Sequence, residues 1–136
     1  MTDEKDRERL VRYQVLHQRI QVLDNRRNLV LNRLIEVENT LFSLDELKQQ
    51  KNKDIFLPLG SGVHASGSLK NVDNMIVLIG ADVAIDMSFD KAKNTLEDNK
   101  KVLEDGLKTI EDELDKLAEE LMNLEPQVQE IVQRRK

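Results

Sequence analysis

The stretch that decides the fold is DIFLPLGSGVHASGSLKNVDNMIVLIGADVAIDM, residues 54–87. It is the part of the chain rich in glycine and in β-branched or small apolar residues, a composition typical of strands and turns. Charged segments with regularly spaced leucines flank it on both sides, as expected for long helices. The sequence therefore predicts one domain of the α+β class, with a β-insert at 54–87 between helices at 3–50 and 88–134.

Four candidate strands lie in the insert: Ile55–Leu59, Val63–Lys70, Met75–Ile79 and Asp82–Met87. Turns at Gly60-Ser61-Gly62 and Gly80-Ala81 would join them into two β-hairpins. Two small hairpins bury too little apolar surface to be stable alone, so strands of other subunits should complete the sheet. The side chains expected to make that contact are Leu57, Val63, Ala65, Leu69, Ile76, Val77, Leu78, Val83 and Ile85.

Short motifs in the chain suggest ligand chemistry, but each has a plainer explanation. Gly60-Ser61-Gly62 lacks the lysine and spacing of a phosphate-binding loop and is typical of a turn. His64 and His17 each stand without the Cys, His or carboxylate partners that a metal site needs. Asp82 and Asp86 share a strand face, where solvation and protection of a sheet edge explain them. We predict no cofactor, no metal and no enzymatic activity.

The composition also limits the function. The chain is 35% charged and 3% aromatic, with no Trp and no Cys, which suits coiled coils better than a compact globular core. A net charge of −5 argues against nucleic acid as the main partner. The charged first residues do not resemble a signal peptide, and no apolar run is long enough to cross a bilayer. We expect a cytoplasmic protein with no membrane contact.

Both flanking segments carry apolar residues at the a and d positions of a heptad repeat. Arg27 takes one a position, where setting the helix register explains it better than catalysis. The second helix should begin after an N-cap at Ser88, and Pro126 should kink its last turns. In the first helix the seam consists of Tyr13, Leu16, Ile20, Leu23, Val30, Leu34, Val37, Leu41 and Leu44, and in the second it runs from Leu96 to Ile131.

A second apolar stripe follows the first helix outside this seam. It consists of Val15, Val22 and Leu29 at position c, with Val11 nearby at position f. A two-stranded coiled coil would leave these side chains exposed. Either a third helix or a neighbouring subunit covers them, or they form an adhesive surface for non-native chains. Arginine occupies position g in four consecutive heptads, at Arg12, Arg19, Arg26 and Arg33.

The two helices should pair antiparallel, because the insert returns the chain to where the first helix ends. Residue 50 would then lie beside residue 88. Charge gives a second guide to the register, since g faces g in an antiparallel pair. It pairs Arg19 with Glu120 and Arg26 with Glu113, although charge alone does not exclude a slip of one heptad.

The order of long helix, two hairpins and long helix resembles the prefoldin family, in particular its α class, which has two hairpins where the β class has one. The matching motifs are LPLGSGVHASG at 57–67 and IGADVAIDMSFDKA at 79–92. The second turn departs from the family pattern, because Ala81-Asp82-Val83 stands where the family has more glycine.

The resemblance implies a hexamer of two α and four β subunits, with the hairpins in a β-barrel body and the coiled coils extending from it. It also implies an ATP-independent chaperone that captures unfolded polypeptides at the coiled-coil tips and delivers them to a group II chaperonin. The implied partners are prefoldin β subunits, a second α subunit, unfolded polypeptides and the chaperonin.

Surplus apolar side chains near both chain ends, beside Pro126, suggest where a client would bind. For five of them, Tyr13, Leu16, Leu124, Val128 and Ile131, the alternative is that they simply close the seam. A competing reading of the whole chain is a structural coiled coil or filament-forming relative that binds no client. The hypothetical client surface is Val11, Tyr13, Val15, Leu16, Met122, Leu124, Val128, Ile131 and Val132.

Overall fold

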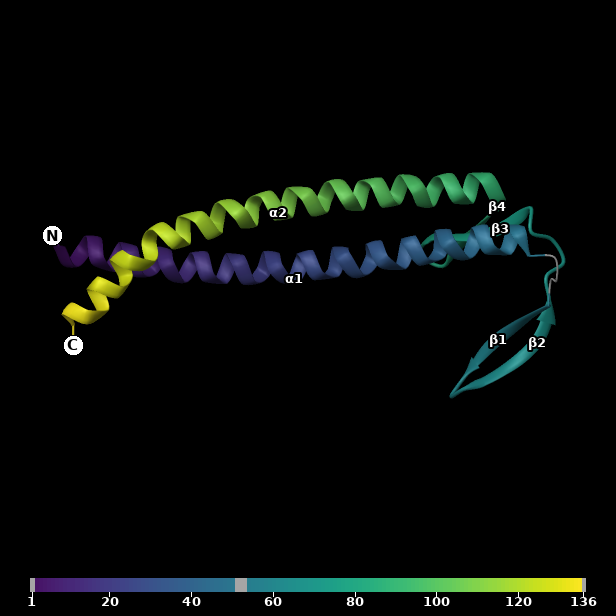
Figure 1. The fold of residues 1–136 in the computed structure, drawn as a ribbon, viewed down its shortest axis with the longest axis horizontal. Helices are drawn as coiled ribbons and strands as arrows, with labels where there is room; N and C mark the ends of the chain where they lie inside the picture. The colour runs from purple at the N-terminus through teal and green to yellow at the C-terminus, as the bar shows by residue number, and fades with distance from the viewer. Residues whose placement is uncertain (1, 51–53, 136) are drawn as a thin grey trace. The chain divides into compact units, whose positions relative to one another are not determined.

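The computed structural model describes residues 2–50 and 54–135 and contains two long helices with two β-hairpins between them (Figure 1). This confirms the predicted fold. The chain divides into two compact units, each described by itself below: a helical unit, Met1–Leu34 with Leu103–Lys136, and a hairpin unit, Ile35–Val102. In chain order the elements are α1 (Thr2–Gln49), β1 (Asp54–Gly60), β2 (Val63–Ser68), β3 (Asn74–Gly80), β4 (Val83–Ser88) and α2 (Phe89–Arg134).

In the helical unit, α1 and α2 run antiparallel and pack through the predicted heptad seam. Leu16 and Leu23 of α1 form the buried core with Ile110 and Leu117 of α2. Residues at the other heptad positions of both helices are mostly exposed. Because a two-helix pair buries one stripe of each helix, the a and d side chains supply nearly all of the apolar burial here.

The ion pairs of the helical unit correct the prediction made from charge. The guanidinium of Arg19 donates to Glu113, and that of Arg12 donates to both carboxylate oxygens of Glu120 at 2.8 and 2.9 Å. The predicted pairs, Arg19 with Glu120 and Arg26 with Glu113, are wrong by one heptad. Glutamate occupies two successive g positions of α2, Glu113 and Glu120, so an arginine of α1 has two candidate partners, and exposed pairs contribute too little free energy to decide between them.

Arg27 lies half-buried in the seam, as its a position requires. Its Nη2 donates to Oδ1 of Asp24 on the same helix. Its Nε is buried and makes no hydrogen bond with the residues that the structure describes. A buried donor without a partner costs free energy, so Arg27 destabilises the seam relative to an apolar residue.

Replacing Arg27 with leucine should therefore raise the free energy of unfolding by about 1–2 kcal/mol. Chemical denaturation of the full chain, followed by far-UV circular dichroism, measures this change. The control Arg26→Leu adds the same side chain at an exposed neighbouring position and should change stability by less than about 0.5 kcal/mol. A loss of stability in Arg27→Leu would show that the arginine has a favourable role in the seam.

In the hairpin unit, the end of α1 and the start of α2 pair in the register expected from the insert. Asp45 accepts a hydrogen bond from Lys93 at 2.9 Å, and these residues lie equally far from positions 50 and 88. Lys48 and Asp90 form an ion pair at 3.6 Å and also lie equally far from positions 50 and 88. The hydrogen bond and charge of Asp45 raise the pKa of Lys93 above its ordinary 10.5. The contribution of this pair to stability is thus present below that value and is lost at higher pH.

The start of α2 is fixed by local contacts. Ser88, the last residue of β4, caps the helix, because its Oγ accepts a hydrogen bond from the Lys91 amide at 3.2 Å. Phe89 is buried, and its amide donates to the Asp73 carbonyl at 2.8 Å. The Lys48 ammonium lies 4.6 Å from the centre of the Phe89 ring. The predicted N-cap is therefore confirmed.

Each hairpin forms a separate two-stranded antiparallel sheet within the described residues, β1 with β2 and β3 with β4. The two turns share one geometry, with positive φ at three consecutive residues. In the first turn glycine takes two of these places, whereas the second has Ala81 at φ 47° and Asp82 at φ 61°. A side chain with a Cβ is strained in this region, so the second turn is the less favourable one.

Glycine at position 81 should relieve that strain by about 1 kcal/mol. Ala81→Gly should slow backbone hydrogen exchange across β3 and β4 in the full chain. Ala84→Gly is the matched control: it makes the same change inside β4, where glycine weakens a strand, and should speed exchange. Faster exchange in Ala81→Gly would contradict the account of the turn.

Candidate functional site

The end of the helical unit that carries both chain termini is called the tip here (Figure 1). The last turns of α2 change direction and cross α1 at the tip. Pro126 lies in this part of α2 and has no N–H to donate to the carbonyl of Met122, which weakens the helix locally. The bend agrees with the kink predicted from Pro126.

The tip buries one charged side chain, Asp6, which is 6% exposed. Arg134 of α2 places Nη2 3.6 Å from its Oδ2, and Arg9 places Nη1 3.8 Å from its Oδ1. Oδ1 accepts no hydrogen bond from the described part of the chain. Sequence reasoning missed Asp6, although the signal was present, because position 6 is the a position one heptad before Tyr13.

Three of the nine side chains assigned to the client surface are buried. Leu16 is 0% exposed and Ile131 is 1% exposed, and Val128 is also in the interior. All three occupy a or d positions, so the packing of α1 against α2 covers them. This corrects their assignment: in this conformation they close the seam, which was the alternative considered for them.

The other assigned side chains keep contact with solvent. Met122 is 71% exposed and projects from α2 away from the seam. Tyr13 is half-buried and meets the ring of His17 edge-on, with the ring centres 4.5 Å apart. The remaining candidates at the tip are thus the exposed Val11, Val15, Met122 and Val132 and the half-buried Tyr13 and Leu124.

The side chains assigned to subunit assembly lie on the hairpins and are accessible. Ala65, Leu69 and Val77 are half-buried. Leu69 does not belong to a strand, because β2 ends at Ser68 rather than at the predicted Lys70. The other six are exposed: Leu57, Val63, Ile76, Leu78, Val83 and Ile85.

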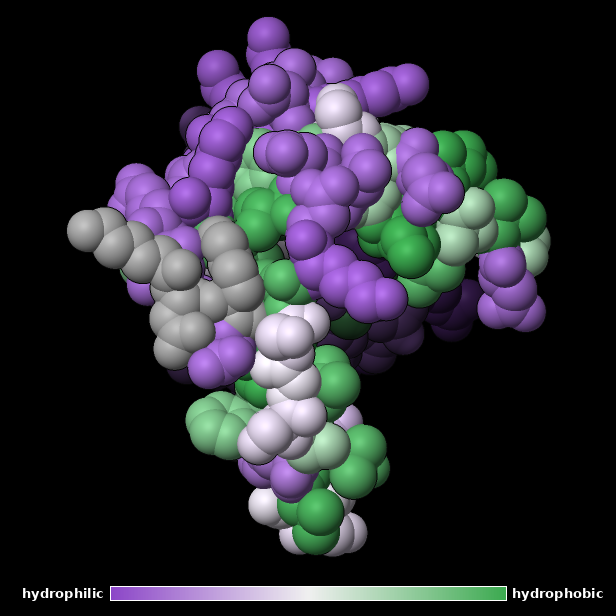
Figure 2. All heavy atoms as spheres, turned by 90° about the vertical axis from the view of Figure 1, so that its right-hand side faces the viewer, coloured by the Kyte–Doolittle hydropathy of each residue, from purple (hydrophilic) through white to green (hydrophobic). Residues whose placement is uncertain are grey.

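The hairpins expose more apolar surface than the assigned residues alone. Phe56 is 75% exposed, and Leu59 and Ile79 are exposed as well. Figure 2 shows this as apolar spheres along β1 and β2, in the lower part of the view. These three residues were not among the side chains assigned to assembly from the sequence. Apolar residues on both faces of a strand indicate that both faces are covered.

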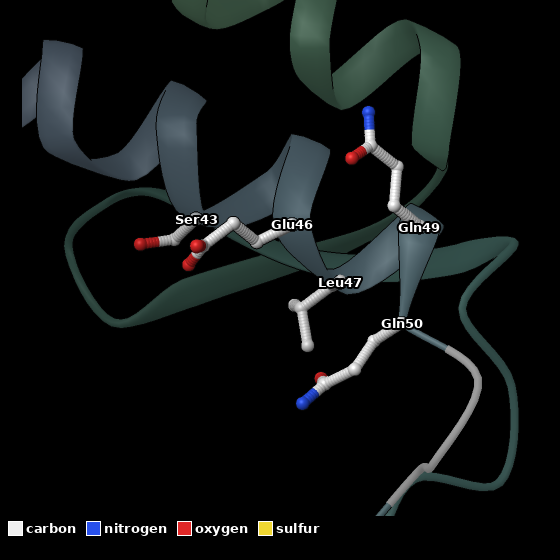
Figure 3. Close-up of a pocket in the computed structure, with 5 residues that line it drawn as sticks. All are labelled: Ser43, Glu46, Leu47, Gln49 and Gln50. Atoms are coloured by element: carbon white, nitrogen blue, oxygen red, sulfur yellow. The ribbon is translucent and has the colours of Figure 1, made fainter.

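No site suited to catalysis appears in the described residues. Figure 3 shows a shallow pocket at the end of α1, where Gln49 points away from Leu47 and Gln50 rather than toward a common centre. Its lining contains no nucleophile paired with a base. Among residues 2–50 and 54–135, no cluster of His, Cys, Asp or Glu could hold a metal ion. No helix in these ranges is long and apolar enough to cross a membrane.

A family model described as prefoldin subunit matches residues 16–134, which comprise α1 from Leu16 onward, both hairpins and the whole of α2. The chain belongs to the prefoldin family.

Within that family it is of the archaeal α type, as the two hairpins predicted. Prefoldin subunit alpha of Methanobrevibacter smithii is 35% identical over 72 residues, which are 53% of this chain and 49% of that protein. The chain thus spans about half the length of that relative. Prefoldin subunit alpha of Thermofilum pendens is 29% identical over 98 residues, 71% of this chain and 76% of that protein.

Two solved structures share the fold. One is the crystal structure of the prefoldin beta subunit from Thermococcus strain KS-1, with a TM-score of 0.60, 20% identity, and coverage of 93% of this chain and 91% of that one. The other is the cryo-EM structure of filamentous PFD from Methanocaldococcus jannaschii, also with a TM-score of 0.60 and 20% identity, covering 90% and 96%. At this identity the likeness shows the fold alone.

Proposed function

We propose that the chain is the α subunit of an ATP-independent chaperone that holds unfolded polypeptides and passes them to a group II chaperonin in the cytoplasm. The observation that carries the proposal is apolar surface at the tip of a chain that belongs to the prefoldin family. Transfer to a chaperonin and the cytoplasmic location rest on the family alone.

The tip suits transient holding of non-native chains. Val11 and Val15 on α1 and Met122 and Val132 on α2 expose apolar surface without a protein partner among the described residues. Unfolded segments expose apolar side chains that would bury against them. Methionine has a flexible, polarizable side chain, so Met122 can adapt to many client sequences. Since these side chains lie on an open surface, binding would be weak and reversible.

The hairpins suit assembly. Each is a two-stranded sheet whose outer edges pair with no further strand among the described residues, and its exposed apolar side chains would be covered by other strands. We propose that these residues join a barrel with hairpins of other prefoldin subunits, in a hexamer of two α with four β subunits. Phe56, Leu59 and Ile79 join the assigned assembly residues in this role.

A second candidate is a structural role in which the hairpins drive self-assembly and no client is bound. The open sheet edges favour it, and the filamentous PFD of Methanocaldococcus jannaschii shares this fold. A holding assay separates the two functions, because a purely structural protein would not suppress client aggregation.

The variant Val11→Ser/Val15→Ser/Met122→Ser/Val132→Ser removes apolar surface at the tip while keeping the buried seam. In the complex formed with a β-type subunit, it should weaken suppression of client aggregation by about tenfold, since exposed apolar area is lost. Light scattering from a chemically denatured client, diluted into the complex, measures this.

The control is Val102→Ser, which makes the same type of change at an exposed position of the hairpin unit. It should suppress aggregation as the unmodified chain does. Unaltered suppression by the fourfold variant, with an intact complex, would refute the proposed client surface.

A further inference from the structure

An apolar stripe on α1 of the helical unit continues beyond the proposed client surface. It consists of Val11, Val15, Val22 and Leu29 and is called the outer stripe. All four side chains are exposed, and Leu29 most of all, at 70%. Three of them repeat at position c, so they keep one orientation relative to the seam along the coiled coil. Val22 and Leu29 are not part of the proposed client surface.

The charged side chains beside the outer stripe have one sign and lie on one side of it. Arginine occupies the neighbouring g position in four successive heptads, and no acidic residue stands at the f, c or g positions from 11 to 33. Arg12 and Arg19 are engaged by the glutamates of α2. Arg26 and Arg33 are exposed and form no ion pair with the residues that the structure describes. On the other side, position f carries the uncharged Gln18, Asn25 and Asn32.

We propose that the outer stripe docks an amphipathic helix of another protein whose apolar face is flanked by glutamate or aspartate. The c residues recur about every 10 Å along α1, the spacing at which a helix presents successive heptads of its own apolar face. Arg26 and Arg33 would pair with the flanking carboxylates, which arginine binds through two parallel hydrogen bonds. Side chains on one face of an extended strand recur at a shorter spacing, and a disordered chain has no regular spacing, so neither matches the c residues of α1.

A second copy of this chain fits the stripe less well. Its acidic helix is α2, whose large exposed apolar side chains among the described residues are Val102, Met122 and Val132. They are too far apart to match three successive heptads. Nucleic acid is disfavoured by the apolar stripe itself and by the net charge of −5.

The probe is a synthetic helical peptide of three heptads with leucine at a and d and glutamate at the flanking positions. Fluorescence anisotropy would measure its binding to the full chain, alone and with a β-type subunit. It should bind about tenfold more tightly than the same peptide with lysine in place of glutamate. Raising the salt concentration to about 1 M should reduce that preference, because exposed ion pairs are screened.

Two variants locate the binding. Val22→Ser/Leu29→Ser should weaken binding of the glutamate peptide by about tenfold, since it removes the two most exposed apolar side chains of the stripe. Arg26→Gln/Arg33→Gln should remove most of the preference for glutamate over lysine. The control Met122→Ser/Val132→Ser changes exposed apolar residues on α2 and should leave peptide binding unchanged.

Equal affinity for the two peptides, or unchanged binding after Val22→Ser/Leu29→Ser, would overturn the proposal. So would sedimentation showing that Val22→Ser/Leu29→Ser separates copies of the chain, because the occupant would then be a second copy. The variants Val22→Ser/Leu29→Ser and Arg26→Gln/Arg33→Gln leave Val11, Val15 and the other client-surface residues unchanged, so the aggregation assay tests client holding separately.

Discussion

The packing of a and d side chains of α1 against those of α2 is the interaction on which the helical unit depends. With 3% aromatic residues, the chain has little else to bury, and Leu16, Leu23, Ile110 and Leu117 form its core. A single seam between two helices leaves the rest of each helix surface open to solvent. The two-stranded sheets are likewise too small to bury their own apolar side chains, which no other part of the described chain covers.

The fold could be predicted from the sequence because its signals are local. Heptad spacing predicted the two helices and the seam between them. The glycine-containing turn sequences predicted the hairpins, and Ser88 as an N-cap predicted the start of α2. The exact strand ends and the ion pairs could not be derived in the same way. Arg19 faces two glutamates one heptad apart, and the choice between them depends on the packing of the whole seam rather than on charge.

The candidate surfaces were harder to predict, because exposure depends on how elements pack. Ile131 looked like surplus apolar surface in the sequence, yet the packing of α1 against α2 buries it. Asp6 looked like part of a solvated charged segment, yet it lies inside the tip between Arg9 and Arg134. Residues such as Met122 and Leu29, which lie off the seam, were identified as exposed by the heptad pattern itself.

We propose that the hairpins are an assembly module whose sheets other subunits complete. Native mass spectrometry of this chain, alone and mixed with a prefoldin β-type subunit, tests it most directly. We expect a defined complex with the mass of two copies of this chain and four of the β type. A chain that stays monomeric in the mixture, or that forms only open-ended assemblies by itself, would contradict it.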